Sequence, residues 1–491
     1  MSNLTDQLFP CRKIAVPSGL TRREWLGGMG YGAGAAALAS LLGNSSSQAS
    51  PVLEDGTILP HFAPKAKRVI CLFMSGGASQ LESFDHKPML KERHGQPLPA
   101  SVFKGRVPLG MSQFQNQFPV QSSRYPFQQY GQSGAWISDR FPYLAQQADK
   151  LCFLKGMVSD AVNHDPAIIF MNSGHQLAGR PTMGAWLSYG LGSENENLPA
   201  YIVMVSKRTP DQPLSSRLWD SGFLPSQHQG VPFRSGKDPV LFLHNPEGLS
   251  DSLHQRMVEQ LIEVQQEELH LRGEAEIAAR IKQFEMAFRM QTAVPEVTDI
   301  SQETKETLNR YGKPVSKPGS FARNCLIARK LCEKGVRFIQ LFHPGWDHHA
   351  GMDSRFSKVA LDVDQPAAAL LQDLEERGLL QETLVMFVTE FGRTPYGQGG
   401  ASKGNEDYGR EHHRDAFTFW VAGGGIKPGI TYGETDEFGF DVVDGKVTVN
   451  DFHATMLHQL GIDHERFTYR FQGRDYRLTN VAGTVVKPIL V

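Results

Sequence analysis

Short, almost continuous apolar runs recur along the chain and are typical of strands buried on both faces of a parallel sheet. The first covers 68–74 and ends in a Ser-Gly-Gly loop, and it is expected to be a central strand. Further runs cover 151–158, 199–205, 336–342, 384–389 and 416–423. Helical patterns lie at 166–172, 321–334, 354–377 and 451–460, and from residue 320 helices and strands alternate. This alternation predicts an α/β fold with a mostly parallel central sheet flanked by helices.

Two segments interrupt this order. Residues 86–135 are rich in Gln, Pro, Phe and Gly without clear periodicity, which predicts a long, irregular but ordered insertion that faces substrate. Residues 251–290 are charged, with apolar residues at three- and four-residue spacing, which predicts an amphipathic helical hairpin. We therefore expect one domain over 60–491, with an irregular insertion at 86–135 and a helical insertion at 250–310.

Composition narrows the possible partners. The 491 residues carry a formal net charge of −2, so no basic excess points to nucleic acid. No two of the five cysteines form a C-x-x-C pair, and buried thiols are a better interpretation than disulfides or metal ligands. These cysteines are Cys11, Cys71, Cys152, Cys325 and Cys332.

The N-terminus indicates export. Arg22 and Arg23 precede a weakly apolar, Gly/Ala-rich run at 27–43, and a small-x-small cleavage site follows at 47–49. Residues 1–49 therefore resemble a twin-arginine signal, read by the twin-arginine export machinery, which predicts a periplasmic or extracellular protein. The run is too short and glycine-rich for a stable transmembrane span, which needs about 20 apolar residues. The alternative is an ordinary amphipathic N-terminal helix.

Candidate metal ligands follow the predicted strands, where ligands bind in open α/β sheets. Asp347 and His349 come just after the run at 336–342 and are two residues apart, so both can face one side of an extended loop. With His412 they would supply three ligands and leave one position open, as expected for catalytic zinc or manganese. The alternative is a hydrogen-bonded polar cluster left over from an ancestral enzyme.

Glu390 and Arg393 follow the next strand-like run. A carboxylate at the end of a buried strand is costly unless it is paired or metal-bound. Glu390 is therefore either a further metal ligand, a group that supports one, or the partner of Arg393. The planar guanidinium of Arg393 could instead bind the anionic oxygen of an ester.

Several of these segments resemble motifs of the alkaline-phosphatase superfamily, which includes sulfatases and nucleotide pyrophosphatases. They are Asn163-His164-Asp165, the Asp347 loop, Glu390-Phe391-Gly392 and the segment 450–461. More closely, the chain resembles an uncharacterised bacterial family, domain of unknown function 1501, through the segments 75–80, 346–349, 390–395 and 469–475. The resemblance covers nearly all of the chain after the signal.

The resemblance implies an alkaline-phosphatase-like sheet and a metal-dependent hydrolase of phosphate or sulfate esters. The anionic ester would be small or part of a sulfated or phosphorylated polymer. It places Asp160 at the nucleophile position, four residues before His164, and gives His164 the role of fixing its loop. A standard formylglycine sulfatase is unexpected because the chain has no C/S-x-P-x-R segment.

Two departures from the superfamily favour a second hypothesis. A Ser-Gly-Gly loop stands where relatives carry a ligand Asp, and Phe391 cannot bind a metal, so one of two metal sites is expected to be eroded. The alternative function is a non-catalytic cell-envelope binding or assembly protein that keeps the fold.

Overall fold

The structure is a computed structural model that describes residues 59–206, 214–234, 239–240, 243, 245, 248–398 and 408–491. The twin-arginine-like segment and Cys11 lie outside the described residues. The other four cysteines are free and buried, as expected.

Nine strands of the described residues form one sheet with β1 near its centre, as the apolar runs predict. β1 is parallel to β7 and β8, and β5 is parallel to β7 and β6. The order is β12 (Ile430–Tyr432), β4 (Cys152–Val158), β11 (Phe417–Ala422), β8 (Thr383–Val388), β1 (Arg68–Ser75), β7 (Phe338–Pro344), β5 (Tyr201–Val205), β6 (Val231–Phe233), with β15 (Val447–Thr448) beside β4.

The predicted fold class is confirmed, with one exception to the parallel order. β11 is antiparallel to both of its neighbours, β4 and β8. Its chain enters after the hairpin of β9 (Gly392–Gly397) and β10 (Arg410–His413), which follows the carboxyl end of β8 without a crossover helix. A strand that starts at that edge runs back across the sheet, since parallel pairing needs a long crossover.

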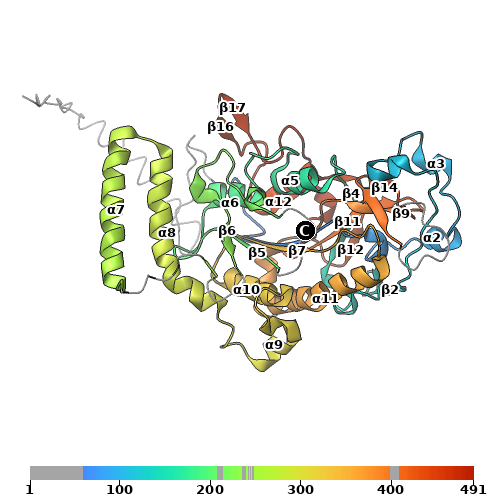
Figure 1. Cartoon of the computed structure of the whole chain (residues 1–491), viewed down its shortest axis with the longest axis horizontal. Coiled ribbons are helices and arrows are strands. Elements are labelled where there is room, and N and C mark those ends of the chain that lie inside the picture. The colour runs from blue at the N-terminus through green and yellow to red at the C-terminus, as the bar shows by residue number, and fades with distance from the viewer. Residues whose placement is uncertain are drawn as a thin grey trace, which may run out of the picture. The chain divides into compact units, whose positions relative to one another are not determined.

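Helices cover both faces of the sheet (Figure 1). α10 (Phe321–Glu333) and α11 (Met352–Glu376) lie on one face; α5 (His164–Ser173), α6 (Met183–Leu191) and α12 (Val449–Gln459) lie on the other. The side chains of β1 alternate between two apolar cores, because successive residues of a strand point to opposite faces. Ile70 and Leu72 join one core, and Cys71 and Phe73 join the other.

The two interrupting segments also have secondary structure. The first contains α2 (Pro88–Glu92), α3 (Ala100–Phe103) and β2 (Phe127–Tyr130), and β2 pairs with β3 (Ala135–Ser138), which begins where the segment ends. The second is a pair of long helices, α7 (Asp251–Arg272) and α8 (Ala275–Thr298), which turn at Gly273 with φ +67°. A left-handed φ of this kind favours glycine.

Besides short 3-10 helices, the described part of the chain has a few smaller elements, and none of its helices is long and apolar enough to cross a membrane. They are α4 (Pro142–Ala145), α9 (Lys305–Tyr311), the pair β13 (Glu434–Thr435) and β14 (Val442–Asp444), and the pair β16 (Tyr469–Phe471) and β17 (Arg474–Tyr476).

Candidate metal centre

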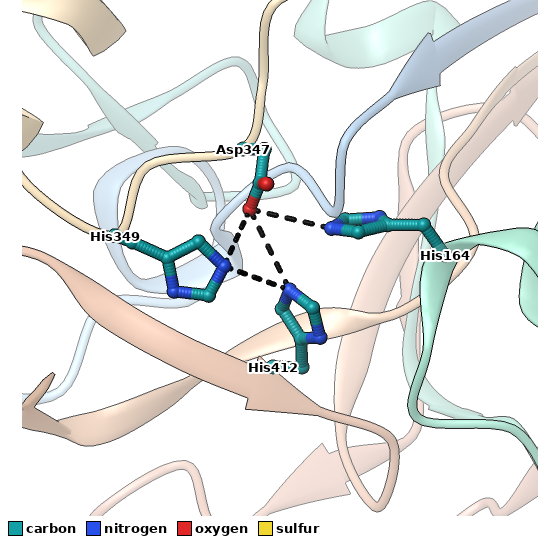
Figure 2. A group of neighbouring side chains, drawn as sticks. All are labelled: His164, Asp347, His349 and His412. Carbon is teal, nitrogen blue, oxygen red and sulfur yellow. Dashed lines mark hydrogen bonds and ion pairs between the residues drawn. The ribbon is translucent and has the colours of Figure 1, made fainter. Parts of the chain in front are cut away.

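Three imidazoles and one carboxylate meet beyond the carboxyl ends of the central strands (Figure 2). Asp347 and His349 lie on the loop after β7, His164 begins α5 after β4, and His412 lies on β10. One ligand atom from each of the four lies within 4.8 Å of those of the others. Three segments that are far apart in sequence therefore supply one cluster.

The carboxylate oxygen Oδ1 of Asp347 is the common point of the cluster (Figure 2). It lies 2.9 Å from Nε2 of His349, 3.3 Å from Nε2 of His164 and 3.5 Å from Nε2 of His412. The His349 side chain is 30 % exposed, so the cluster is open to solvent on that side.

The opposite nitrogen of each ring is held by an acceptor. Nδ1 of His164 donates to Oε1 of Glu390 at 2.7 Å, and Nδ1 of His412 donates to the Val162 carbonyl at 2.8 Å. Nδ1 of His349 donates to the amide oxygen of Gln398. A neutral imidazole carries one N–H, so these bonds leave each Nε2 lone pair facing the centre.

These residues fit a divalent metal ion. Nε2 of His349 and Nε2 of His412 lie 3.0 Å apart, and two lone pairs at that distance repel each other unless a proton or cation lies between them. Three imidazole nitrogens and one carboxylate oxygen are a donor set that suits zinc and other transition metals. Imidazoles that bind metals usually have their second nitrogen held by a carboxylate or carbonyl, as here.

The pKa shifts of Asp347 and His412 favour the protonation states that bind a metal, an ionised carboxylate and a neutral imidazole. Burial alone would raise the pKa of Asp347, but the close contacts of its Oδ1 with the three imidazoles and the nearby charge of Arg393 lower it far below its usual value. Burial, helped by the charge of Arg393, lowers the pKa of His412 to about 4. Against the effect of its burial, Asp347 and Glu390 raise the pKa of His164. At neutral pH Asp347 and His412 are therefore a carboxylate and a neutral imidazole.

Fixed contacts position the elements that carry these groups. The fully buried Arg410 of β10 donates to Glu82 at 2.7 Å and to the Thr394 carbonyl at 2.9 Å. Gly409, beside it, packs against the backbone of His349 so closely that a Cβ there would lie 1.9 Å from the His349 carbonyl carbon. The β9–β10 hairpin and the Asp347 loop are thereby held against each other.

Arg393 is placed differently from the expectation that it binds an ester anion. Its side chain is fully buried, and its donors reach Oδ1 of Asp347 at 2.6 Å and the carbonyls of Gly76, Gly77 and Arg410. Because these acceptors occupy the guanidinium, Arg393 holds the Asp347 carboxylate and has no donor turned to solvent. The suggested Glu390–Arg393 pair is also replaced: Glu390 pairs with His164, and Arg393 pairs with Asp347.

The sequence suggested Glu390 as a metal ligand and His164 as a residue that fixes its loop, but in the structure His164 belongs to the cluster and Glu390 supports it. The buried Glu390 lies behind His164 and also accepts from the Gly76 N–H at 2.9 Å, while Nε2 of His164 faces the cluster. The sequence could have marked His164 as a candidate ligand, because it follows the carboxyl end of β4 just as Asp347 follows that of β7.

Asp160, the expected nucleophile, is exposed and is not among the four clustered groups. Its backbone carbonyl accepts from Arg414 at 2.7 Å. Phe391 lies beside the cluster: its ring centre lies 4.5 Å from that of His412 and 4.9 Å from that of His164. It forms an apolar wall there.

Solved structures with related folds come from several kinds of protein. The lipoteichoic acid synthase LtaP from Listeria monocytogenes is 10% identical, with a TM-score of 0.35 over 88% of this chain and 78% of that one. The phosphonate monoester hydrolase SpPMH from Silicibacter pomeroyi is 10% identical, with a TM-score of 0.33 over 87% and 76%. The zinc complex of the C-terminal periplasmic domain of EcEptC from Escherichia coli is 8% identical, with a TM-score of 0.35 over 85% and 88%.

Sequence comparison assigns the family. No curated protein matches the chain. The model of the family described as "Protein of unknown function (DUF1501)" matches residues 66–490. Because this match covers most of the chain, the expected family is confirmed, and the protein is a member of the DUF1501 family.

Proposed function

We propose that this chain is an exported hydrolase of phosphate or sulfate esters that works with one divalent metal ion, zinc or manganese. The observation that carries the proposal is the convergence of three imidazole Nε2 atoms and one carboxylate oxygen within 4.8 Å. The ligands would be His164, Asp347, His349 and His412. The ester class follows from the motif resemblance to the alkaline-phosphatase superfamily.

The four protein ligands still allow access to substrate. Zinc can expand to five ligands, and manganese commonly takes six, so either ion would keep a position for a substrate oxygen or water. When bound, such an ion lowers the pKa of a coordinated water and neutralises charge that develops on the ester oxygens. The exposed part of His349 marks the side from which an ester could enter.

The chain's own residues supply orientation and charge balance. Glu390, the Val162 carbonyl and Gln398 orient the three imidazoles, and Arg393 holds the carboxylate of Asp347. Since Asp160 lies outside the cluster and Phe391 walls off one side, we propose a single ion and attack by water, without a covalent intermediate on Asp160.

The competing hypothesis of a non-catalytic envelope protein rested on an eroded site. The two departures that suggested erosion, the Ser-Gly-Gly loop and Phe391, leave the four-residue cluster intact. A chain that had lost its metal would have no need to keep three imidazoles oriented with their lone pairs toward one carboxylate. The complete cluster therefore favours the enzyme.

The test combines metal analysis with turnover. The purified protein should contain about one equivalent of zinc or manganese, since the cluster offers one set of ligands. It should also hydrolyse an aryl phosphate or an aryl sulfate. His349→Ala should lose both metal and turnover while remaining folded, whereas His270→Ala, on exposed surface of α7, should keep both. Absence of metal, or equal turnover in the two variants, would contradict the proposal.

Export is tested separately. Replacing Arg22 and Arg23 together by lysine should leave the protein in the cytoplasm, as judged by cell fractionation, if the pair is read as a twin-arginine signal. Unchanged export would show that another signal acts.

A further inference from the structure

α7 presents a second apolar face that its own chain does not cover. In the hairpin it packs against α8, and it lies on the outer side of the pair (Figure 1). The half-buried residues of α7 that face inward recur at helical spacing: His254, Val258, Ile262, Gln265 and Leu269. One side of the helix is thus occupied by intramolecular packing.

Next to this inner face runs a stripe of exposed apolar side chains. Each is between 39 % and 78 % exposed, and the first four follow one another at spacings of four, four and three residues: Leu253, Met257, Leu261, Val264 and Leu271. Glu268 interrupts the stripe and pairs with Arg272 at 3.2 Å. Three- and four-residue spacing places the stripe along one side of the helix, as in the seam between packed helices. Contiguous exposed apolar surface of this kind indicates an interface.

The far flank of the stripe carries charges of both signs at separate places along the helix. Arg256, Gln260, Glu263 and Glu267 are all exposed and follow one another at three- and four-residue spacing. Glu263 and Glu267 are four residues apart, so they repel each other on α7 itself. The positive charge lies at one end of this flank and the negative charges lie toward the other.

We infer that α7 pairs with α7 of a second copy of this chain, in antiparallel orientation about a two-fold axis near residue 262. In an antiparallel helix pair, the same flank of each helix faces its counterpart. With the axis near residue 262, each residue lies opposite a partner residue at the same distance on the other side of that position, so the two residue numbers add to about 523–525. Leu261 meets the partner's Val264, and Arg256 meets the partner's Glu267.

The charges distinguish this arrangement from its alternative. In the antiparallel pair, Arg256 of each copy neutralises the partner's Glu267, and two-fold symmetry makes this contact twice. In a parallel pair, opposite flanks face each other, so Arg256 of one copy would face the partner's inner side, which packs on α8, and would gain no opposite charge. The flank therefore fits a second copy of this chain in one orientation, independently of the proposed hydrolase activity.

Sedimentation velocity of the full-length protein over a concentration series tests the pairing. The wild-type protein should be a dimer. Leu261→Glu should weaken dimerisation at least tenfold, whereas Leu361→Glu, which changes an apolar residue of α11 that is 73 % exposed, should not. Arg256→Glu should weaken the dimer, and the double variant Arg256→Glu/Glu267→Arg should restore it. Circular dichroism should show equal helix content in all variants, because these side chains face away from α8.

Each contrary outcome overturns the inference. A wild-type monomer would leave the stripe to a different partner. A dimer that resists Leu261→Glu would be formed by another surface. A dimer that Leu261→Glu dissociates but that the charge exchange fails to restore would exclude the antiparallel register.

Discussion

Glu390→Gln is the change that most directly separates a metal centre from a polar cluster. Glu390 is fully buried, and its Oε1 accepts from His164 at 2.7 Å and from the Gly76 N–H at 2.9 Å. Glutamine keeps the shape and an acceptor oxygen, and its amide nitrogen can donate to Thr389, whose hydroxyl lies 3.2 Å from Oε2 of Glu390. The substitution therefore removes the charge behind His164 while the packing is kept.

The expected loss of metal affinity follows from the hydrogen bond between Glu390 and His164. Groups that hold a ligand imidazole typically contribute about 10- to 100-fold to metal affinity, which is about 1.4–2.8 kcal/mol. At a metal concentration 100 times the wild-type Kd, binding stabilises the fold by about 2.7 kcal/mol. A variant that binds 100-fold more weakly would gain only about 0.4 kcal/mol at the same concentration.

Competition with a chelator of known zinc affinity measures the loss of metal affinity. Thermal unfolding with and without zinc measures how much metal binding stabilises the fold. Asp364→Asn is the matched control. It also neutralises a buried carboxylate, which accepts the N–H groups of Tyr143 and Leu144 and lies outside the cluster. Its zinc affinity should stay at the wild-type value. If Glu390→Gln binds zinc as tightly as Asp364→Asn does, the cluster does not hold a metal through His164.

Two further changes probe stability and packing. Burial lowers the pKa of His453 to about 4 from the ordinary 6.5, so the unfolded chain binds a proton more readily and stability is lost as the pH falls from 6.5 toward 4. This histidine alone should cost about 2 kcal/mol between pH 7 and pH 5, and urea unfolding of His453→Gln should show a correspondingly shallower pH dependence. Gly409→Ala would force a Cβ into the backbone of His349, so zinc affinity by chelator competition should fall by about tenfold or more; unchanged affinity would show that this close approach does not position His349.

The apolar runs predicted most of the sheet because burial on both faces leaves a local mark on the sequence. The run at 68–74 became the central strand β1, and the alternating order after residue 320 became α10, β7, α11 and β8. The hairpin of β9 and β10 was not predicted as strands. It mixes Gly, Pro and Tyr with charged and polar residues, which are buried by ion pairs and backbone contacts such as Arg410 with Glu82, and no periodicity reveals such contacts.

The candidate site, too, was predicted only in part. Its place at the carboxyl ends of the strands, and the inclusion of Asp347, His349 and His412, could be expected from the sequence alone, because strand ends in a parallel sheet converge at one edge. The sequence alone could not show which of the neighbouring side chains turn toward the cluster. His164 faces the cluster with Glu390 behind it, and the donors of Arg393 reach Asp347 and carbonyls of the Ser-Gly-Gly loop.

The sequence by itself determined the layers of this protein, its family and the edge of the sheet where acids and imidazoles gather, since burial patterns and motifs are written in neighbouring residues. Only the tertiary structure decided which side chain faces the centre and which supports it from behind. The direction of a loop side chain depends on contacts with segments hundreds of residues away, such as the 226-residue separation between His164 and Glu390.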